Sequence, residues 1–332
     1  MTETAFLPLQ ERDRWMHPSP FRRIARVPDS AADLTRRGVT PPDPVRAVIL
    51  ESIAHRFLAG YNAMLEARPF ARLDAVLAET EPARHGFVVE GAAMGAAIRD
   101  GLSLRGGLLE TLGARHGARF EYLMSVGAGW AIARMPWRRG RILSAFDPLL
   151  GALACDGHGF HDLYFHPRKA ETGAISRYAG ERARSYDEGL GRALWFIASG
   201  TPERLDTLLG RFAPERRLDM LSGVGLAMAY AGPSAAQDWA VLRTSHAAHW
   251  AHVGQGVCFA AEAMRRCGQM PEHTTLACHV ALGRDPDAAA DIAAETRPAG
   301  VTPERAAEAY RAWRAAIRDR LAAEPPHPED AP

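Results

Sequence analysis

Several features that mark particular classes of protein are scarce in this sequence. Lys169 is the only lysine, the four cysteines contain no CxxC pair, and 40 basic against 39 acidic residues leave a formal charge of +1. A chain without excess charge has no field that attracts a phosphate backbone or an anionic bilayer. Scattered cysteines without ligand spacing predict free thiols. We therefore expect no nucleic-acid partner, no resident metal and no cofactor.

Long hydrophobic runs are also missing. No window reaches the roughly 18 apolar residues that a membrane helix needs, and the start MTETAFLPLQERDRWM has no charged head followed by an apolar stretch. The sequence thus predicts a soluble cytoplasmic protein without membrane insertion. Its 332 residues, 47% of them hydrophobic, suffice for one large core or two ordinary domains.

Signals for helix starts dominate what is present. Four short stretches place Pro at a first helical position with Glu next; they begin at Thr201, Ala213, Met270 and Thr302. The missing N–H of proline is harmless there and its fixed φ suits a helix, while the Glu carboxylate meets the positive end of the helix dipole. Alternating strand patterns are rare, and the best strand candidates are residues 120–126 and 162–165. The expected fold class is therefore mainly α with few short strands.

Two segments of the sequence resemble each other, which indicates an internal repeat. RLDAVLAETEPARHGFVVEG, residues 72–91, aligns without gaps on RLDTLLGRFAPERRLDMLSG, residues 204–223, with seven of twenty positions identical. This pattern predicts two diverged helical units packed as one body. We expect an irregular arm at 1–44, unit one at 45–166, a connection at 167–185, unit two at 186–289, C-terminal helices at 290–323 and a disordered tail at 324–332.

Glycine pairs recur in apolar, small-residue runs. GAGWAI at Gly127, GVGLAM at Gly223 and GQGVCF at Gly254 start like a dinucleotide-binding loop but lack its final Gly or Ala. Small residues also let neighbouring helices approach more closely than the usual ~8–10 Å between axes. Because the same texture recurs along the chain, close helix packing is the favoured interpretation.

The densest polar cluster is DGHGFHDLYFH, residues 156–166. Imidazole and carboxylate groups are the usual ligands of zinc or iron, so a metal site is one interpretation. Its two glycines favour a turn, which leaves a hydrogen-bonded structural turn and a catalytic or ligand-contacting His161 as the other interpretations. The residues alone do not decide among the three.

Acidic side chains inside apolar helical runs mark candidate pocket residues. Glu90 and Glu262 would each be costly to bury without a partner. In YDEGLGRALWF, Glu188 and Arg192 are one helical turn apart, in the order that favours an ion pair on the surface. If that face borders a cavity instead, the same residues would supply polar contacts beside an aromatic wall. We take as candidate catalytic residues His161, Glu90, Arg192 and Glu262.

Motifs along nearly the whole chain, from about residue 38 to 292, resemble one family. GFVVEGAAM, VGAGWAIARMP, ACDGHGFHDLYFH, DEGLGRALWF, SGVGLAMAYAG and PEHT occur in this order. They resemble the UnbL-type enediyne biosynthesis proteins, a bacterial family of unknown function found in enediyne polyketide gene clusters. The resemblance implies a part in natural-product assembly, where a synthase makes a linear polyene and accessory proteins help to convert it. It carries over no catalytic residue.

Together these features predict a cleft between the two units that binds an apolar polyene intermediate. We expect Trp130, Trp195, Phe196 and Trp250 to line it, because burying apolar surface is worth ~25 cal/mol per Å2 without a charged partner. The first alternative is a helical scaffold that docks the polyketide synthase or accessory proteins. The second is a metalloenzyme that uses residues 156–166. Whether the protein is an enzyme stays open at this point.

Overall fold

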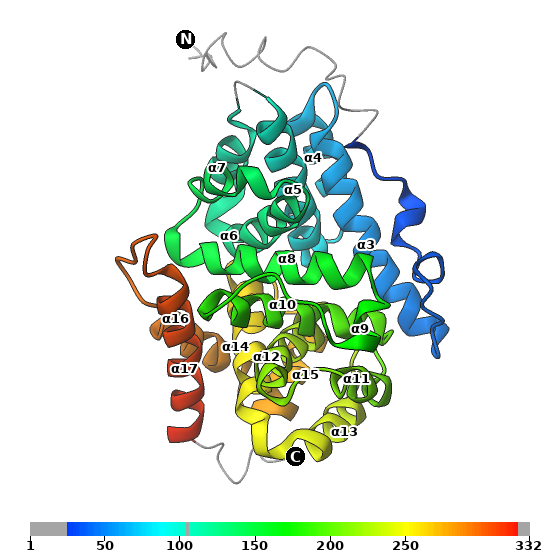
Figure 1. Ribbon diagram of the computed structural model, residues 1–332, viewed down its shortest axis with the longest axis vertical. Coiled ribbons are helices and arrows are strands. Elements are labelled where there is room, and N and C mark those ends of the chain that lie inside the picture. Colours follow the sequence, from blue (N-terminus) through cyan, green and yellow to red (C-terminus); the bar gives the residue numbers. More distant parts are fainter. Residues whose placement is uncertain (1–24, 104–105, 325–332) are drawn as a thin grey trace, which may run out of the picture.

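The mainly α fold class is confirmed. The computed structural model describes residues 25–103 and 106–324, and within these ranges there is no strand. Long helices follow one another along the chain, each packed against the next, as the colour sequence of Figure 1 shows. Their bounds are α3 Pro44–Met64, α5 His85–Leu102, α6 Leu108–Arg134, α8 Gly151–Phe165, α10 Glu181–Ile197, α12 Pro214–Ala231 and α14 Trp250–Arg266.

Shorter helices join the long ones, and two C-terminal helices cover one side. α16 packs on α14, and α17 contacts α8, α10, α14 and α16, so the end of the chain closes over its middle (Figure 1). The connecting and C-terminal helices are α4 Pro69–Ala78, α7 Arg139–Leu143, α9 Lys169–Thr172, α11 Pro202–Leu209, α13 Ala236–His246, α15 Glu272–Ala277, α16 Pro286–Glu295 and α17 Ala306–Ala323.

Paired glycines bring consecutive long helices into backbone contact. Where α6 crosses α8, Gly129 faces the carbonyl oxygen of Ala154 and Gly157 faces that of Val126. A Cβ at either glycine would lie well inside the 3.0 Å at which atoms must shift. The same reciprocal arrangement occurs at other crossings, through Gly60 and Gly91, Gly159 and Gly189, Gly191 and Gly223, and Gly225 and Gly256. The packing interpretation of the glycine runs is therefore confirmed.

The spacing of these glycines follows from helix geometry. Two residues along an α-helix correspond to a rotation of about 200°, so the glycines of a Gly-x-Gly motif lie on nearly opposite faces. In α10, Gly189 meets α8 while Gly191 meets α12. A helix with a neighbour on each side needs one such bare position per side. The Gly-x-Gly motif, which resembles the start of a phosphate-binding loop, therefore lets a helix pack closely against a neighbour on each side.

Both predicted strands, residues 120–126 and 162–165, are wrong. The first lies in α6, just after a kink at Phe120, where φ is −129° and ψ is 21°. The second is the last turn of α8, and the turn expected in DGHGFHDLYFH is also α8. α8 is buried at every position from Ala152 to Tyr164, so its apolar residues show no one-sided helical period. Gly157 and Gly159 serve helix contacts there.

The duplication remains a prediction. Residues 72–91 fall in α4 and α5, and their counterparts 204–223 fall in α11 and α12. The expected connection 167–185 contains α9 and the start of α10, and α16 begins at Pro286, before the expected boundary at 290. Residues 1–24 of the arm and 325–332 of the tail lie outside the described residues. None of the helices in the described ranges is long and apolar enough to cross a membrane.

Candidate functional site

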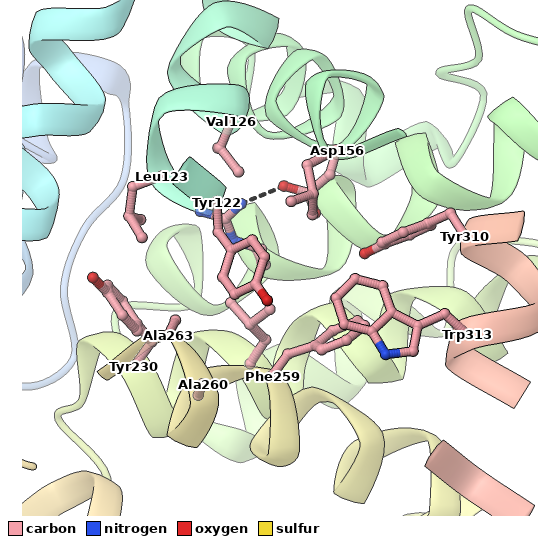
Figure 2. A pocket seen from close by; sticks show the side chains of 13 residues that line it. Tyr122, Leu123, Val126, Asp156, Tyr230, Phe259, Ala260, Ala263, Tyr310 and Trp313 are labelled. Carbon is pink, nitrogen blue, oxygen red and sulfur yellow. Dashed lines mark hydrogen bonds and ion pairs between the residues drawn. The ribbon is translucent and has the colours of Figure 1, made fainter. Parts of the chain in front are cut away.

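Two apolar cavities lie inside the helical array. The first, which we call the Trp313 cavity, is lined from α6, α8, α10, α12, α14 and α17, by residues that include Tyr122, Leu123, Val126, Leu153, Phe259, Tyr310 and Trp313 (Figure 2). The second, the Trp130 cavity, is lined from α3, α5, α6, α8, α10 and α12, by residues that include Phe57, Phe87, Trp130, Phe160, Tyr164, Phe165 and Phe196.

The two cavities meet at a shared wall. Arg192, Leu226 and Tyr230 line both of them. Leu226 is half-buried although its neighbours in the middle of α12 are buried, so its side chain borders open space. The volumes are about 50 Å3 and about 40 Å3, each enough for a few water molecules. A longer guest requires Leu226 or Tyr230 to move aside.

A buried charge cluster forms the polar part of this wall. Arg192 pairs with Asp156 through Nη1 and Oδ1, the interaction dashed in Figure 2, and its Nη2 lies 3.9 Å from Oε1 of Glu90. The exposed fractions are 8% for Arg192, 1% for Asp156 and 3% for Glu90. Asp156 lines the Trp313 cavity, and Glu90 lines the Trp130 cavity. The Arg192 guanidinium therefore interacts with two carboxyl groups, one at each cavity.

Burial decides the protonation of these carboxyls. Desolvation raises the pKa of Glu90 to about 7, and Arg192 opposes the shift only in part. The same balance raises the pKa of Asp156 to about 7, where Arg192 is again the main opposing charge. Two buried acids against a single cation leave one negative charge unmatched when both ionise. The Arg192 cluster therefore keeps a proton near neutral pH.

This raised pKa predicts how stability depends on pH. The folded protein holds protons on Glu90 and Asp156 that the unfolded chain has already released, so the free energy of unfolding falls as pH rises toward 7. That fall runs from the unfolded pKa of about 4.5 to the folded pKa of about 7, so Glu90→Gln should flatten it between pH 5 and 7, measured by urea unfolding. Histidines whose pKa is lowered act equally in both proteins and cancel in the comparison. An unchanged slope would contradict a titrating Glu90.

A second buried network ties α17 to the array. Glu188 accepts hydrogen bonds from Ser222 at 2.8 Å and Tyr310 at 2.7 Å, and Arg314 lies 3.0 Å from Asp219. Arg314 is 2% exposed. These contacts join α10, α12 and α17 beside the Trp313 cavity, and they show that Glu188 does not pair with Arg192. The expected Glu188–Arg192 pair is wrong, because the two side chains take partners on other helices.

The four candidate catalytic residues occupy different places. Glu90 and Arg192 come together at the shared wall. His161 lies outside the cavity linings, where its Nε2 accepts from Arg134 at 3.3 Å and its ring packs edge-on to Trp130. Glu262, in α14, pairs with Arg265 at 2.8 Å and lines neither cavity. Of the four candidates, the structure therefore brings Glu90 and Arg192 together and leaves His161 and Glu262 outside the cavity linings.

The predicted aromatic wall is right in part. Trp130 and Phe196 line the Trp130 cavity. Trp195 is fully buried and donates its indole N–H to the carbonyl of Gly232 at 2.8 Å, and Trp250 donates to Ala281 at 2.8 Å beside a separate hollow. On α10 the adjacent Trp195 and Phe196 point about 100° apart, so only one can face the cavity. Sequence reasoning missed Leu226 and Tyr230, which helical spacing alone could not distinguish from core residues.

The polar residues of α8 divide between two faces. Asp156 faces Arg192, whereas Asp162 accepts hydrogen bonds from Tyr186 and Arg177, both at 2.8 Å. His158 bonds the hydroxyl of Tyr178 at 2.8 Å. Among the residues that the structure describes, no three His, Cys, Asp or Glu side chains converge as metal ligands. The arrangement therefore lends no support to the metalloenzyme alternative.

A segment of the N-terminal arm borders the Trp130 cavity. Arg37, in the 3-10 turn Thr35–Arg37, lies over the ring of Tyr164 with 3.8 Å to the ring centre and donates to the Tyr164 carbonyl at 3.0 Å. Burial lowers the pKa of Arg37, and the guanidinium stays a cation at neutral pH. The arm thus adds a cationic rim to an otherwise aromatic wall.

Comparison with known proteins places the chain in a family. Residues 20–321 match the family model described as "Protein of unknown function (DUF1702)". This chain is a DUF1702 protein. The match spans both cavities and the Arg192 cluster, so the site belongs to the part of the chain that defines the family. No curated protein and no solved structure matches this DUF1702 chain significantly.

Proposed function

We propose that this DUF1702 protein binds a linear, apolar, unsaturated chain in its two cavities, as an accessory protein of enediyne-type polyketide biosynthesis. The observation that carries the proposal is the pair of apolar cavities meeting at Arg192, Leu226 and Tyr230. A chain laid through both would touch aromatic and aliphatic side chains along its length and polar groups only at the middle. The pathway itself rests on the motifs that resemble enediyne-cluster proteins.

Binding in this proposal is driven by apolar contact. A conjugated chain is flat and stiff, so it loses little conformational entropy on entering a narrow space between aromatic rings. Phe57 and Phe160 pack on Trp130, with ring centroids 4.3 Å and 5.1 Å away, so these rings form one continuous wall along which the chain would lie. Movement of Leu226 and Tyr230 joins the cavities and lets such a chain pass between them.

Filling the Trp130 cavity should weaken binding. Ala227 is 3% exposed and lines this cavity, so Ala227→Leu places three more carbons where the chain would lie. We expect a loss of at least about tenfold in affinity for 1,6-diphenylhexatriene, equivalent to about 1.4 kcal/mol. The fluorescence of this probe rises in apolar surroundings, which gives a direct titration.

The matched control is Ala240→Leu, at an exposed position in the middle of α13. It adds the same carbons to a helix without entering a cavity, so affinity should stay at the wild-type value. Equal loss in both variants, or a wild-type protein that leaves the probe dark, would contradict internal binding. The scaffold alternative predicts the dark result, so this titration separates the two hypotheses.

A further inference from the structure

Glu90 is a buried acid, 3% exposed, that lines an aromatic cavity. Two donors act on it: the Trp130 indole N–H and the Arg192 guanidinium, whose Nη2 is 3.9 Å away. The Trp130 Nε1 is itself buried without a hydrogen-bond partner of good geometry. Buried polar groups are nearly always paired, so a donor without a well-placed partner beside a buried acid needs an explanation.

Aromatic rings near Glu90 can stabilise a positive charge on a guest molecule, against the two guanidinium groups, Arg37 and Arg192, that line the same cavity. The Trp130 cavity presents the faces and edges of aromatic rings, among them Phe57, Trp130, Phe160 and Phe196. Aromatic faces attract cations through the negative face of the ring, most strongly where water is excluded. Phe160 already accepts such a contact from Arg192, at 5.1 Å to the ring centre. A carbocation formed beside Glu90 would be held in the same way.

We infer that Glu90 is the general acid for cis–trans isomerisation of a conjugated polyene bound in the Trp130 cavity. The inference rests on the proposed binding function and names its chemistry. The conjugated part of the chain then extends from the shared wall into the Trp130 cavity, with its end carbon at Glu90. The Glu90 carboxyl donates its proton to that end carbon, and a π-electron pair forms the new C–H bond. The positive charge spreads over alternate carbons, which lowers the order of the former double bonds and permits rotation. The carbon then returns a proton to the Glu90 carboxylate, and the double bonds re-form.

This isomerisation consumes no other reactant. One proton leaves Glu90 and one comes back, no electron is gained or lost, and the product differs from the substrate only in geometry. The ion pair of the polyene cation with the Glu90 carboxylate replaces two neutral groups in a dry cavity, where opposite charges attract strongly. Arg192 donates to Asp156 through Nη1, and its Nη2, 3.9 Å from Glu90, also stabilises the carboxylate that Glu90 becomes.

Arg37 and Arg192 are the other charged residues that line the Trp130 cavity, and Asp156 pairs with Arg192. Arg192 and Asp156 face it from α10 and α8 and form a neutral pair when Asp156 is ionised. Burial raises the pKa of Glu90 to about 7, so the carboxyl holds a proton at neutral pH and releases it readily. This is the range in which general acids are most effective.

The test measures deuterium uptake by a polyene and the cis–trans geometry of its double bonds in one experiment. Purified full-length protein is incubated with all-trans-2,4,6,8-decatetraene in D2O, and the recovered hydrocarbon is analysed by mass spectrometry and by chromatography for cis isomers. We expect deuterium at the chain ends and new cis isomers with wild type. Glu90→Gln should lower both by at least about 100-fold, the lower range of general acid catalysis, while 1,6-diphenylhexatriene still binds.

Two further variants sharpen the test. Glu215→Gln removes an exposed carboxylate in the first turn of α12 and should keep full exchange. Phe160→Leu keeps apolar volume but removes a cation-stabilising ring, so exchange should fall several-fold while the probe still binds; this holds even if Glu90→Gln folds poorly. A wild type that binds the probe without exchange overturns the inference and leaves the binding function standing. A wild type that binds no probe overturns both, and undiminished exchange in Glu90→Gln overturns the role of Glu90.

Discussion

A single methyl group at Gly223 is expected to cost at least about 3 kcal/mol of stability, the upper end for overpacking a core. In Gly223→Ala the new Cβ would overlap the carbonyl oxygen of Glu188 and press on the backbone nitrogen of Arg192. Both are backbone atoms of α10, so no side-chain rotation can relieve the clash, and the helices must separate. Urea unfolding followed by circular dichroism measures the loss.

The matched control lies in another helix. Gly117, in α6, has nothing within 4 Å of an added Cβ, so Gly117→Ala removes backbone entropy from the unfolded chain without a clash. We expect it to be neutral or stabilising by up to about 1 kcal/mol. Similar destabilisation by both substitutions would mean that helix contact at Gly223 is looser than described, and that the glycine pairs do not set the spacing.

Arg192→Leu is expected to destabilise the fold by about 3–5 kcal/mol at pH 8. The substitution leaves Asp156 and Glu90 buried together without their cation, the situation in which breaking a buried pair costs most. The cost should shrink below pH 6, because both carboxyls can then take up protons and become neutral. Urea midpoints at pH 5.5 and pH 8 would show the difference.

An exposed arginine provides the comparison. Arg305 pairs with Glu308 at 3.4 Å, and their side chains are 73% and 56% exposed. Arg305→Leu should change stability by less than about 1 kcal/mol at either pH, since water screens such pairs. A pH-independent loss in Arg192→Leu would argue that the guanidinium matters for packing rather than for charge.

Part of the candidate site follows from the sequence. Glu90 stands among small and apolar residues, and an acid there signals a buried partner or a cavity. Arg192 was singled out for its neighbour Glu188, one turn away, yet it pairs with Asp156, which is 36 residues away in the chain. His161 was chosen from a polar cluster that α8 divides between two faces. Local spacing therefore found candidate residues but not their partners.

The sequence by itself determined the helical class, the absence of phosphate loops and the glycine positions where helices can approach closely. Only the tertiary structure decided which helix meets each glycine, and with it the rotation of every long helix about its axis. That rotation turns Arg192, Leu226 and Tyr230 toward one wall and Trp195 away from it. The physical reason is that a helix buried on all sides has no polar face, so its orientation is fixed by backbone contact with two neighbours.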